Sequence, residues 1–555
     1  MMKHPKIVIV GGVAGGMSAA TRLRRLLEEA EIIVLEKGPY VSFANCGLPY
    51  YLSGEIANRE QLLVQTKEKL NQRFKLDVRV NHEVVAIDRK QKLLQVLHQG
   101  KTESLAYDYL ILSTGAKAYI PDLPGIDQAK QLFSVRNIPD IDAIMNSLQT
   151  GQVKEITVIG SGFVGLEMVE NLAKRGLRVT LIEQAKQVLP ALDEEMAVFI
   201  EEALQQNKVN VKTNVAVSAF LEEGRILQLS DGSQLTSDLT ILAIGVQPAT
   251  QLAQQAGLTL GLRSGIVVDE HFRTSDPAIF AIGDAIVVNQ QISQQAALIS
   301  LASPANRQGR QLADVIAGLK RTHRGSLGTA IVRVFEQVAA FTGLTEKAVK
   351  ALNLPYQVVH TLGKSHASYY PGAEDILLKL IFHPQTGKIY GAQAIGKSGV
   401  DKRMDVLATA IKANLTVFDL PELELSYAPP FGSAKDPVNM LGYAAMNLIE
   451  GLSETIQWHE LAEQLAQGKV LLDVRTEEEY EKAHIKTAYS IPLDELRDRL
   501  SELNPAKSYI VSCYSGLRSY LAERILKQNG FKVQNLDGAF YLYSHAMKGR
   551  NIDVQ

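Results

Sequence analysis

Two glycine-rich turns, each placed between a short apolar run and a helical stretch, constrain the fold of this chain more than any other feature. The first turn, Gly11-Gly12-Val13-Ala14-Gly15-Gly16, follows residues 7–10, an apolar run typical of a buried parallel strand. A helix is expected from Met17 to about Glu29, and a second strand from Ile32 to Glu36. Glycines let the backbone approach a pyrophosphate, and the helix N-terminus offers N–H groups. The pattern predicts a βαβ dinucleotide-binding unit, although Val13 takes the place of the middle glycine.

The second turn, Gly160-Ser161-Gly162-Phe163-Val164-Gly165, is a complete G-x-G-x-x-G between the run 156–159 and a helix to about Arg175. Glu36 and Glu183 each close the second strand of their unit, where an acid accepts hydrogen bonds from a ribose diol. An acid at Glu183 favours NADH, with NADPH still possible. Two units in one chain indicate one stationary and one exchangeable dinucleotide, and two NAD sites are the less favoured alternative.

Size and composition narrow the class of protein. A chain of 555 residues is too long for one core and should form three or four domains. The net charge of -2 gives no reason to expect nucleic acid or an anionic membrane as partner, and no apolar run approaches the length of a membrane helix. Cys46 and Cys513 are the two cysteines, too few and too far apart for a disulfide framework, so free thiols in a reducing cytoplasm are expected.

Three further apolar runs end in small-residue turns, at 110–116, 239–245 and 278–285. With these motifs in this order, the chain resembles the flavin-dependent pyridine-nucleotide–disulfide oxidoreductases over roughly residues 1–445. The resemblance implies FAD on the first unit and NAD(H) on the second. It also implies that the turns at Thr114-Gly115 and Gly245 mark crossings between the two domains, and that Gly283 and Asp284 contact the ribityl–phosphate region of the flavin.

The C-terminal part carries a different pattern. Strands are expected at 470–475 and 508–512, and Cys513-Tyr514-Ser515-Gly516-Leu517-Arg518 leads from the second into a helix from Tyr520 to Gln528. With Ala483-His484-Ile485 between the strands, this part resembles a rhodanese, or sulfurtransferase, domain. The resemblance implies that Cys513 carries sulfur as a persulfide, which backbone N–H groups stabilise. Arg518 follows Cys513 by five positions, whereas a phosphatase loop spaces them by six, and His484 is expected to be structural.

The expected fold is α/β, with two Rossmann-like domains of glutathione-reductase type, an α+β dimerisation domain and an α/β rhodanese domain. The expected boundaries are 1–117 and 250–327 for the two parts of the FAD-binding domain, 118–249 for the NAD(H)-binding domain, 328–445 for the dimerisation domain, 446–456 for a linker and 457–555 for the rhodanese domain. The dimerisation domain implies a homodimer.

Cys46 stands alone where a dithiol reductase has a C-x-x-x-x-C pair, so one sulfur has to face the flavin and bond to the substrate. This pattern resembles the single-cysteine subgroup of coenzyme A disulfide reductases, NADH-dependent persulfide reductases, NADH oxidases and peroxidases. Residues 42–51 look most like the first branch. That resemblance implies that Ser42 and Asn45 hold the pantetheine end of coenzyme A and that two partner-subunit tyrosines, Tyr427 and Tyr369 or its neighbour Tyr370, reach the sulfur. The thiolate needs electropositive surroundings, which a helix N-terminus could supply.

The predicted catalytic residues are Cys46, Cys513, Tyr369, Tyr427 and Arg518. The helix after the first turn carries Arg22, Arg24 and Arg25, of which one or two could clamp the phosphates of coenzyme A, and the full predicted coenzyme A set is Arg22, Arg25, Ser42, Asn45, Asn306 and Arg307. The predicted dinucleotide-binding residues are Gly11, Gly12, Val13, Ala14, Gly15, Gly16, Glu36, Lys37, Thr114, Gly115, Gly160, Gly162, Val164, Gly165, Glu183, Gly245, Gly283 and Asp284. No metal is expected.

Together these features predict an FAD-dependent NAD(P)H oxidoreductase that reduces coenzyme A disulfide, coenzyme A persulfide or polysulfide through Cys46. It would release thiol and sulfide, and Cys513 would handle the persulfide sulfur. One alternative is an NADH oxidase or peroxidase in which Cys46 cycles through sulfenic acid. The other is a redox-sensing protein whose rhodanese module binds a partner without catalysis.

Overall fold

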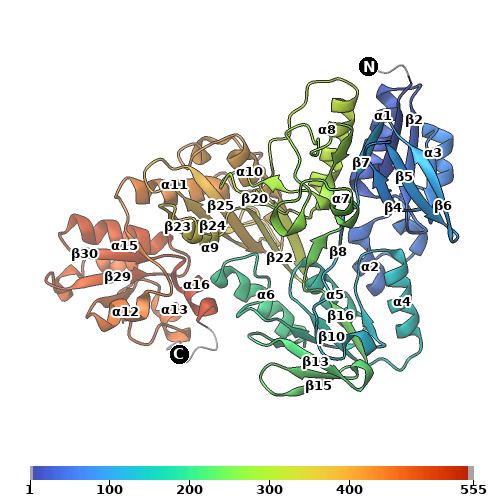
Figure 1. Cartoon of the computed structure of the whole chain (residues 1–555). Helices are drawn as coiled ribbons and strands as arrows, with labels where there is room; N and C mark the ends of the chain where they lie inside the picture. Colours follow the sequence, from blue (N-terminus) through green and yellow to red (C-terminus); the bar gives the residue numbers. More distant parts are fainter. Residues whose placement is uncertain (1–3, 548–555) are drawn as a thin grey trace. The chain divides into compact units, whose positions relative to one another are not determined.

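The computed structural model describes residues 4–547 of the chain (Figure 1). These residues form two compact units. The first runs to residue 184 and takes in 209–328, and the second contains 185–208 and the chain from residue 329 onward. In the described part of the chain, no helix combines the length and the apolar character needed to cross a membrane.

The first unit contains the first predicted nucleotide fold. Its parallel sheet has the order β18-β7-β1-β2-β3, formed by Ile279–Ala281, Tyr109–Leu112, Lys6–Val10, Glu31–Glu36 and Asp77–Val80. Helix α1 (Ala14–Leu26) begins three residues before the predicted start because the glycine turn itself opens the helix. Helix α8 (Ala302–Ile316) packs on α1 so closely that a Cβ on Gly309 would lie 2.2 Å from the carbonyl oxygen of Gly15.

The second nucleotide fold repeats this construction. Its sheet has the order β12-β11-β10-β16-β9, formed by Asn210–Lys212, Arg178–Ile182, Glu155–Ile159, Leu239–Leu242 and Leu132–Phe133. Helix α5 (Phe163–Lys174) follows the glycine turn directly, and α4 (Ile138–Gln149) precedes β10. The chain passes between the two sheets twice, and the passing strands β8 (Ala116–Ala118) and β17 (Val246–Pro248) pair antiparallel, so both connections lie side by side.

Smaller elements complete the first unit. Two antiparallel three-stranded sheets and a strand pair are formed by β4 (Glu83–Asp88), β5 (Leu93–His98), β6 (Lys101–Ala106), β13 (Val217–Leu221), β14 (Ile226–Leu229), β15 (Gln234–Thr236), β19 (Val288–Asn289) and β20 (Ala296–Ala297). The remaining α-helices are α2 (Leu48–Ser53), α3 (Lys67–Phe74) and α7 (Gln251–Gln255). Helix α2 follows Cys46 and contacts α5, which brings this cysteine toward the second glycine turn.

The second unit contains an antiparallel five-stranded sheet. Its order is β21-β22-β25-β24-β23, formed by Ala330–Val334, Gln337–Gly343, Ile389–Gly396, Asp375–Phe382 and Gln357–Lys364. Every residue of β25 is buried, so both faces of the sheet are covered at its centre. The accompanying helices are α6 (Glu194–Gln206), α9 (Glu346–Ala351), α10 (Val400–Lys412) and α11 (Pro437–Ile449).

The C-terminal sheet is parallel, with the order β26-β30-β29-β27-β28, formed by Thr455–Ile456, Lys532–Leu536, Ser508–Ser512, Val470–Asp473 and Tyr489–Ser490. Figure 1 shows β29 and β30 between α15 (Leu517–Gln528) and the pair α12 (Leu461–Ala466) and α13 (Glu477–Lys482), and the set is completed by α14 (Leu493–Leu496) and α16 (Ala539–Ala546). Within the expected linker 446–456, residues up to Ile449 belong to α11 and the last two belong to β26.

Candidate active site

The first glycine turn is shaped for close contact with a phosphate group. Gly11 has a φ of +103°, and a Cβ on Gly16 would lie 1.9 Å from the carbonyl oxygen of Gly11, so neither position accepts a side chain without rearrangement. The Gly12 N–H donates to Glu36 Oε2 at 2.9 Å, which places the acid from the end of β2 at the turn. Turn and acid therefore lie where the pyrophosphate and ribose of a dinucleotide would be bound.

The second turn has the same geometry. Gly160 has a φ of +99°, and a Cβ on Gly165 would lie 1.9 Å from the carbonyl oxygen of Gly160. The backbone N–H and the hydroxyl of Ser161 both donate to Glu183 Oε2, at 2.9 and 2.7 Å. Gly162 has no heavy atom within 4 Å of a built Cβ, which leaves space for a pyrophosphate at the turn. Both sites therefore fit a dinucleotide by their backbone shape.

The turn around Cys46 is attached to both nucleotide folds. The exposed Cys46 lies in a short 3₁₀ segment (Asn45–Gly47) before α2. Upstream of it, the Ser42 N–H donates to the carbonyl oxygen of Gly12 at 2.9 Å, and the Asn45 side-chain amide donates to the backbone oxygen of Arg136 at 2.6 Å. Ser42 also has a φ of +47°, a conformation that non-glycine residues adopt at a cost of about 1 kcal/mol or more. The turn is therefore held in a set position between the two folds.

Several groups act on the pKa of the Cys46 thiol. Partial loss of water around the sulfur raises this pKa most, the Glu167 carboxylate raises it next, Arg136 lowers it, and Asp284 raises it by less than either charged neighbour. Cys46 lies two residues before the start of α2. Burial and the two carboxylates together outweigh the Arg136 guanidinium, so the pKa of the thiol is raised.

Three residues around Cys46 were not predicted. The Tyr50 hydroxyl donates to Glu167 Oε1 at 3.1 Å, and an Arg136 guanidinium nitrogen lies 3.7 Å from Asp284 Oδ2. Burial raises the pKa of Asp284, and Arg136 opposes that effect. Glu167 lies two positions after Gly165 on a helix and Arg136 in a short connection, so neither position carries a motif that would have identified it.

Four of the six predicted coenzyme A residues, Arg22, Arg25, Asn306 and Arg307, lie on the α1–α8 pair. The Arg22 Nε–H donates to Asp314 Oδ1 at 2.7 Å, so this guanidinium already has an anionic partner on α8. The Ser18 hydroxyl donates to Asn306 Oδ1 at 2.6 Å, and Arg25 and Arg307 are exposed. Arg24, which sequence analysis had grouped with its neighbours, is buried and donates to five backbone carbonyl groups, so it serves the fold.

The two predicted tyrosines lie together in the second unit. The hydroxyl oxygens of Tyr369 and Tyr427 are 3.1 Å apart although the residues are far apart in sequence. Both side chains are exposed, Tyr369 by 73% and Tyr427 by 48%. The hydrogen bond with Tyr427 raises the pKa of Tyr369. Tyr370 points to a different partner, with its ring centroid 5.7 Å from that of His366.

Cys513 directly follows β29 (Ser508–Ser512) and is fully buried. The Gly516 N–H donates to its sulfur at 3.1 Å, and the Phe540 N–H donates to its carbonyl oxygen at 2.9 Å. Two nitrogens of Arg518 donate to Glu479 at 2.5 and 2.7 Å, and these bonds hold the pKa of Glu479 down to about 2. Arg518 therefore ties the loop to α13.

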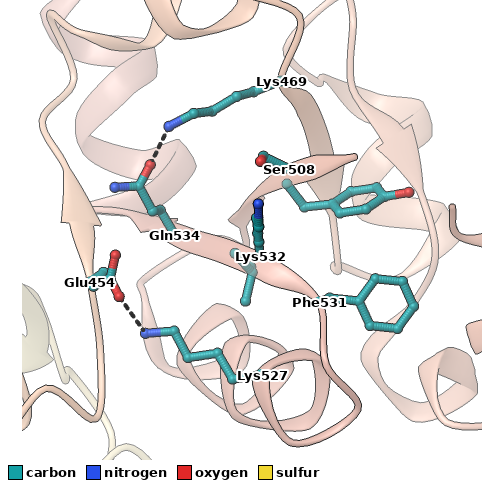
Figure 2. Close-up of a pocket in the computed structure, with 9 residues that line it drawn as sticks. Glu454, Lys469, Ser508, Lys527, Phe531, Lys532 and Gln534 are labelled. Carbon is teal, nitrogen blue, oxygen red and sulfur yellow. Dashed lines mark hydrogen bonds and ion pairs between the residues drawn. The ribbon is translucent and has the colours of Figure 1, made fainter. Parts of the chain in front are cut away.

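Two other features of the rhodanese domain lie apart from this sulfur. His484 stacks on Tyr480 at 3.8 Å between ring centroids and contacts its backbone oxygen at 2.8 Å, as a packing residue would. A hollow of about 450 Å³ lies at the amino-terminal edge of the sheet, lined by Ser508 and Lys532, the first residues of β29 and β30 (Figure 2). Cys513 follows the opposite end of β29. Lys469 and Lys527 in the hollow already pair with Gln534 and Glu454 (Figure 2).

Models of known protein families match three parts of this chain. Residues 5–309 match the pyridine nucleotide-disulphide oxidoreductases. The chain belongs to this family. Residues 329–436 match the family's dimerisation domain, and residues 457–546 match the rhodanese-like domain. The predicted family, rhodanese domain and fold class are confirmed. Membership of the family implies FAD and NAD(P)H as cofactors, and the two glycine turns have the shape to bind them.

Individual proteins are also similar to this chain over most or nearly all of its length. A coenzyme A disulfide reductase of Staphylococcus haemolyticus is 35% identical over 446 residues, which are 80% of this chain and 100% of that protein. The structure of reduced Bacillus anthracis CoADR-RHD is 52% identical, with a TM-score of 0.97, and the match covers 99% of each chain. The structure of an NAD-dependent persulfide reductase from A. fulgidus is 37% identical, with a TM-score of 0.92, over 97% of this chain and 100% of that one.

Proposed function

We propose that this chain uses NADH to reduce a disulfide or persulfide of coenzyme A at Cys46. The observation that carries the proposal is the position of a lone, exposed thiol on a turn bonded to both nucleotide folds. A thiol placed there is accessible to a substrate and adjoins both dinucleotide units. The relatives named coenzyme A disulfide reductase and NAD-dependent persulfide reductase support the same substrate class.

In this reaction, the Cys46 thiolate attacks one sulfur of coenzyme A disulfide, forms a mixed disulfide and releases one coenzyme A thiolate. FAD held at the first glycine turn and Glu36 would supply the redox chemistry, which passes two electrons from NADH to sulfur. Reduction breaks the mixed disulfide and returns the Cys46 thiolate and a second coenzyme A thiol. With coenzyme A persulfide, the balance is one coenzyme A and one sulfide for each NADH and proton consumed.

The residues beside Cys46 control its charge. Partial burial, Glu167 and Asp284 oppose the thiolate and raise the pKa of Cys46, so the resting sulfur holds its proton more firmly than an ordinary cysteine. Arg136 reduces this effect and pairs with Asp284. We assign Ser42 and Asn45 to the pantetheine end, with Arg25, Asn306 and Arg307 as candidates for the phosphates. Arg22 is the weakest candidate because Asp314 already binds it.

The functional form would be a homodimer, in which Tyr369 and Tyr427 of the partner subunit meet the leaving sulfur at Cys46. The close pairing of these hydroxyl groups favours Tyr369 over Tyr370. A phenol in this position can donate a hydrogen bond to a departing thiolate. We further propose NADH as the preferred donor because Glu183 lies at the second glycine turn, where an acid can accept hydrogen bonds from a ribose diol. We propose a reducing cytoplasm as the location because both cysteines are free.

Cys513 would supply the outer sulfur. Its thiolate would take a sulfur atom from a persulfide or polysulfide donor and release the donor's thiol. Cys513 persulfide would then transfer this sulfur to coenzyme A, and Cys46 would reduce the coenzyme A persulfide to sulfide. The Gly516 N–H that already points at Sγ provides one of the donors that a persulfide anion needs.

The test compares Cys46→Ser with Cys513→Ser in the full-length FAD-bound protein. With coenzyme A disulfide and no oxygen, Cys46→Ser should lose NADH oxidation by about a thousandfold or more while its flavin stays bound. Cys513→Ser should keep this activity within about twofold and lose transfer of sulfur to coenzyme A. Undiminished turnover by Cys46→Ser would refute the role of Cys46. Oxygen consumption in excess of thiol and sulfide release would favour an NADH oxidase instead.

A further inference from the structure

A network of charged side chains lies deep in the second unit, and the proposed reduction does not use it. The fully buried Lys379 ammonium lies 2.9 Å from Asp193, 2.5 Å from Glu195 and 3.0 Å from Glu346. These three carboxylates are close enough together to share a metal ion. The lysine nitrogen already lies among them and neutralises part of their charge, so the cluster is a closed ion network and carries no metal proposal.

His360 connects this network to the rhodanese domain. Its Nε2 lies 3.2 Å from Glu195 Oε1, and its Nδ1 lies 2.7 Å from Asp537 Oδ2. The backbone N–H of His360 also donates to Asp537 Oδ1 at 3.0 Å. Ionised carboxylates only accept hydrogen bonds, so both ring nitrogens have to donate, and only the protonated imidazolium carries two N–H groups. With both carboxylates ionised, this geometry fits a positive charge on His360.

The surroundings of His360 favour the same charge. Burial by itself lowers the pKa of His360, but Asp537 and Glu195 outweigh it and raise the pKa to about 9. Glu195 comes from α6 and Asp537 follows β30; beyond them are Lys379 of β24 and Glu346 of α9. The Gln457 amide gives Asp537 Oδ2 a neutral donor at 3.0 Å. A neutral His360 would leave two buried carboxylates facing one ring with a single N–H between them.

Asp537 begins the turn that holds the Cys513 loop. Gly538 and Ala539 follow it with φ of +70° and +52°, and the second value is unfavourable for alanine. The next two N–H groups, of Phe540 and Tyr541, donate to the carbonyl oxygens of Cys513 and Tyr514 at 2.9 and 3.0 Å. The backbone on both sides of the Cys513–Tyr514 bond is thus fixed by a turn whose first residue is fixed by His360.

We propose that His360 is a positioning residue for sulfur transfer at Cys513, acting through Asp537. The imidazolium holds the Asp537 carboxylate, this carboxylate holds the strained turn, and the turn keeps the loop in the shape that aims the Gly516 N–H at sulfur. His360 touches no reacting atom. The inference rests on the proposed sulfur-transfer role of Cys513, and it adds a residue from the dimerisation segment to that reaction.

The experiment uses the full-length FAD-bound protein with His360→Gln, and with His459→Gln as the control. His459 is an exposed histidine of the rhodanese domain that lies against Trp458. With thiosulfate as sulfur donor and cyanide as acceptor at pH 7, His360→Gln should lower kcat about tenfold, the effect of losing charge-assisted hydrogen bonds. NADH-driven reduction of coenzyme A disulfide and the activity of His459→Gln should stay within about twofold of wild type. Unchanged sulfur transfer by His360→Gln would overturn the proposal.

The pH dependence separates positioning through charge from a merely structural loss. The contribution of a group with a raised pKa is present at low pH and disappears as the pH rises through that pKa. The ratio of wild-type to His360→Gln turnover should therefore fall toward one above the pKa of about 9. A ratio that stays constant across that range would contradict the proposal.

A second variant and a second readout keep the test decisive. Asp537→Asn preserves side-chain size and removes only the charge, so it replaces His360→Gln as the test if that variant fails to fold. Asp537→Asn should lower sulfur transfer. Wild-type activity of Asp537→Asn would overturn the proposal. Combining the two variants should recover part of the lost rate, because no unpaired charge remains. Alkylation of Cys513 should be faster in His360→Gln, since the loop loosens. This readout works even if the wild type transfers no sulfur, a result that would refute only the proposed function of Cys513.

Discussion

The two cysteines of this chain occupy opposite kinds of environment. Cys46 is exposed on a turn held between two nucleotide folds, and partial loss of water around its sulfur, together with nearby carboxylates, raises the pKa of its thiol. Cys513 is fully buried at the end of a parallel strand, with a backbone N–H pointing at its sulfur. A sulfur that bonds to a large disulfide needs access, whereas a sulfur that carries one additional sulfur atom needs shielding and hydrogen-bond donors. This difference fits a role in reduction for Cys46 and a role in carrying sulfur for Cys513.

The largest difference between the two cysteine sites is expected for a variant of the Cys513 loop. Arg518→Ala removes both hydrogen bonds to Glu479 and should lower sulfur transfer about tenfold to a hundredfold, the range for a charged pair. Arg518→Lys should recover little, because lysine lacks the paired donors. Reduction of coenzyme A disulfide should not change. The measurement is the rate of both reactions in the same preparation, and an equal loss in both would contradict the separation of the two sites.

A smaller effect is expected at Cys46. Glu167→Gln removes the larger of the two opposing charges, so the pKa of the thiol should fall and the thiolate should be more abundant at neutral pH. The rate of alkylation of Cys46 by iodoacetamide should rise roughly a few-fold at pH 7, and its pH profile should move to lower pH. Asp142→Asn, which removes a carboxylate that is bound to Arg59, is the control. A profile that moves to higher pH would show that Glu167 acts in another way.

The smallest effect is expected at the paired tyrosines. Tyr427→Phe removes one hydroxyl of the pair and should lower kcat/KM for coenzyme A disulfide roughly two- to tenfold, as the loss of one hydrogen bond does. Tyr370→Phe is the matched control, because that ring contacts His366 and not Tyr427. Steady-state kinetics on both variants measures the difference. A larger loss for Tyr370→Phe would reverse the assignment.

The features that could be predicted from the sequence are those that depend on residues close together in the chain. The glycine turns, the strands before them and the Cys513 loop are short-range patterns, and they were placed within a few residues. Helices α1 and α15 begin three residues earlier than expected, because turn residues were counted as loop. Strands β21 to β24 were not predicted, since their apolar runs carry no accompanying motif.

The site contacts were harder to predict because they join residues that are distant in sequence. The backbone oxygen of Arg136 accepts a hydrogen bond from the side chain of Asn45, the residue before Cys46. No local sequence pattern indicates this contact. His360 meets Glu195 and Asp537 only after three separate segments fold together. The two cysteines and the nucleotide-binding turns could be identified from the sequence. The charged groups that shift the pKa of the Cys46 thiol and position the Cys513 loop are brought to them by tertiary packing.

The central claim, that Cys46 forms a covalent bond with the substrate, is tested most directly by intact-protein mass spectrometry. The FAD-bound protein is incubated with coenzyme A disulfide in the absence of NADH. One coenzyme A adduct per chain is expected, absent in Cys46→Ser, retained in Cys513→Ser and removed when NADH is added. An adduct that persists in Cys46→Ser, or one that NADH fails to release, would contradict the claim.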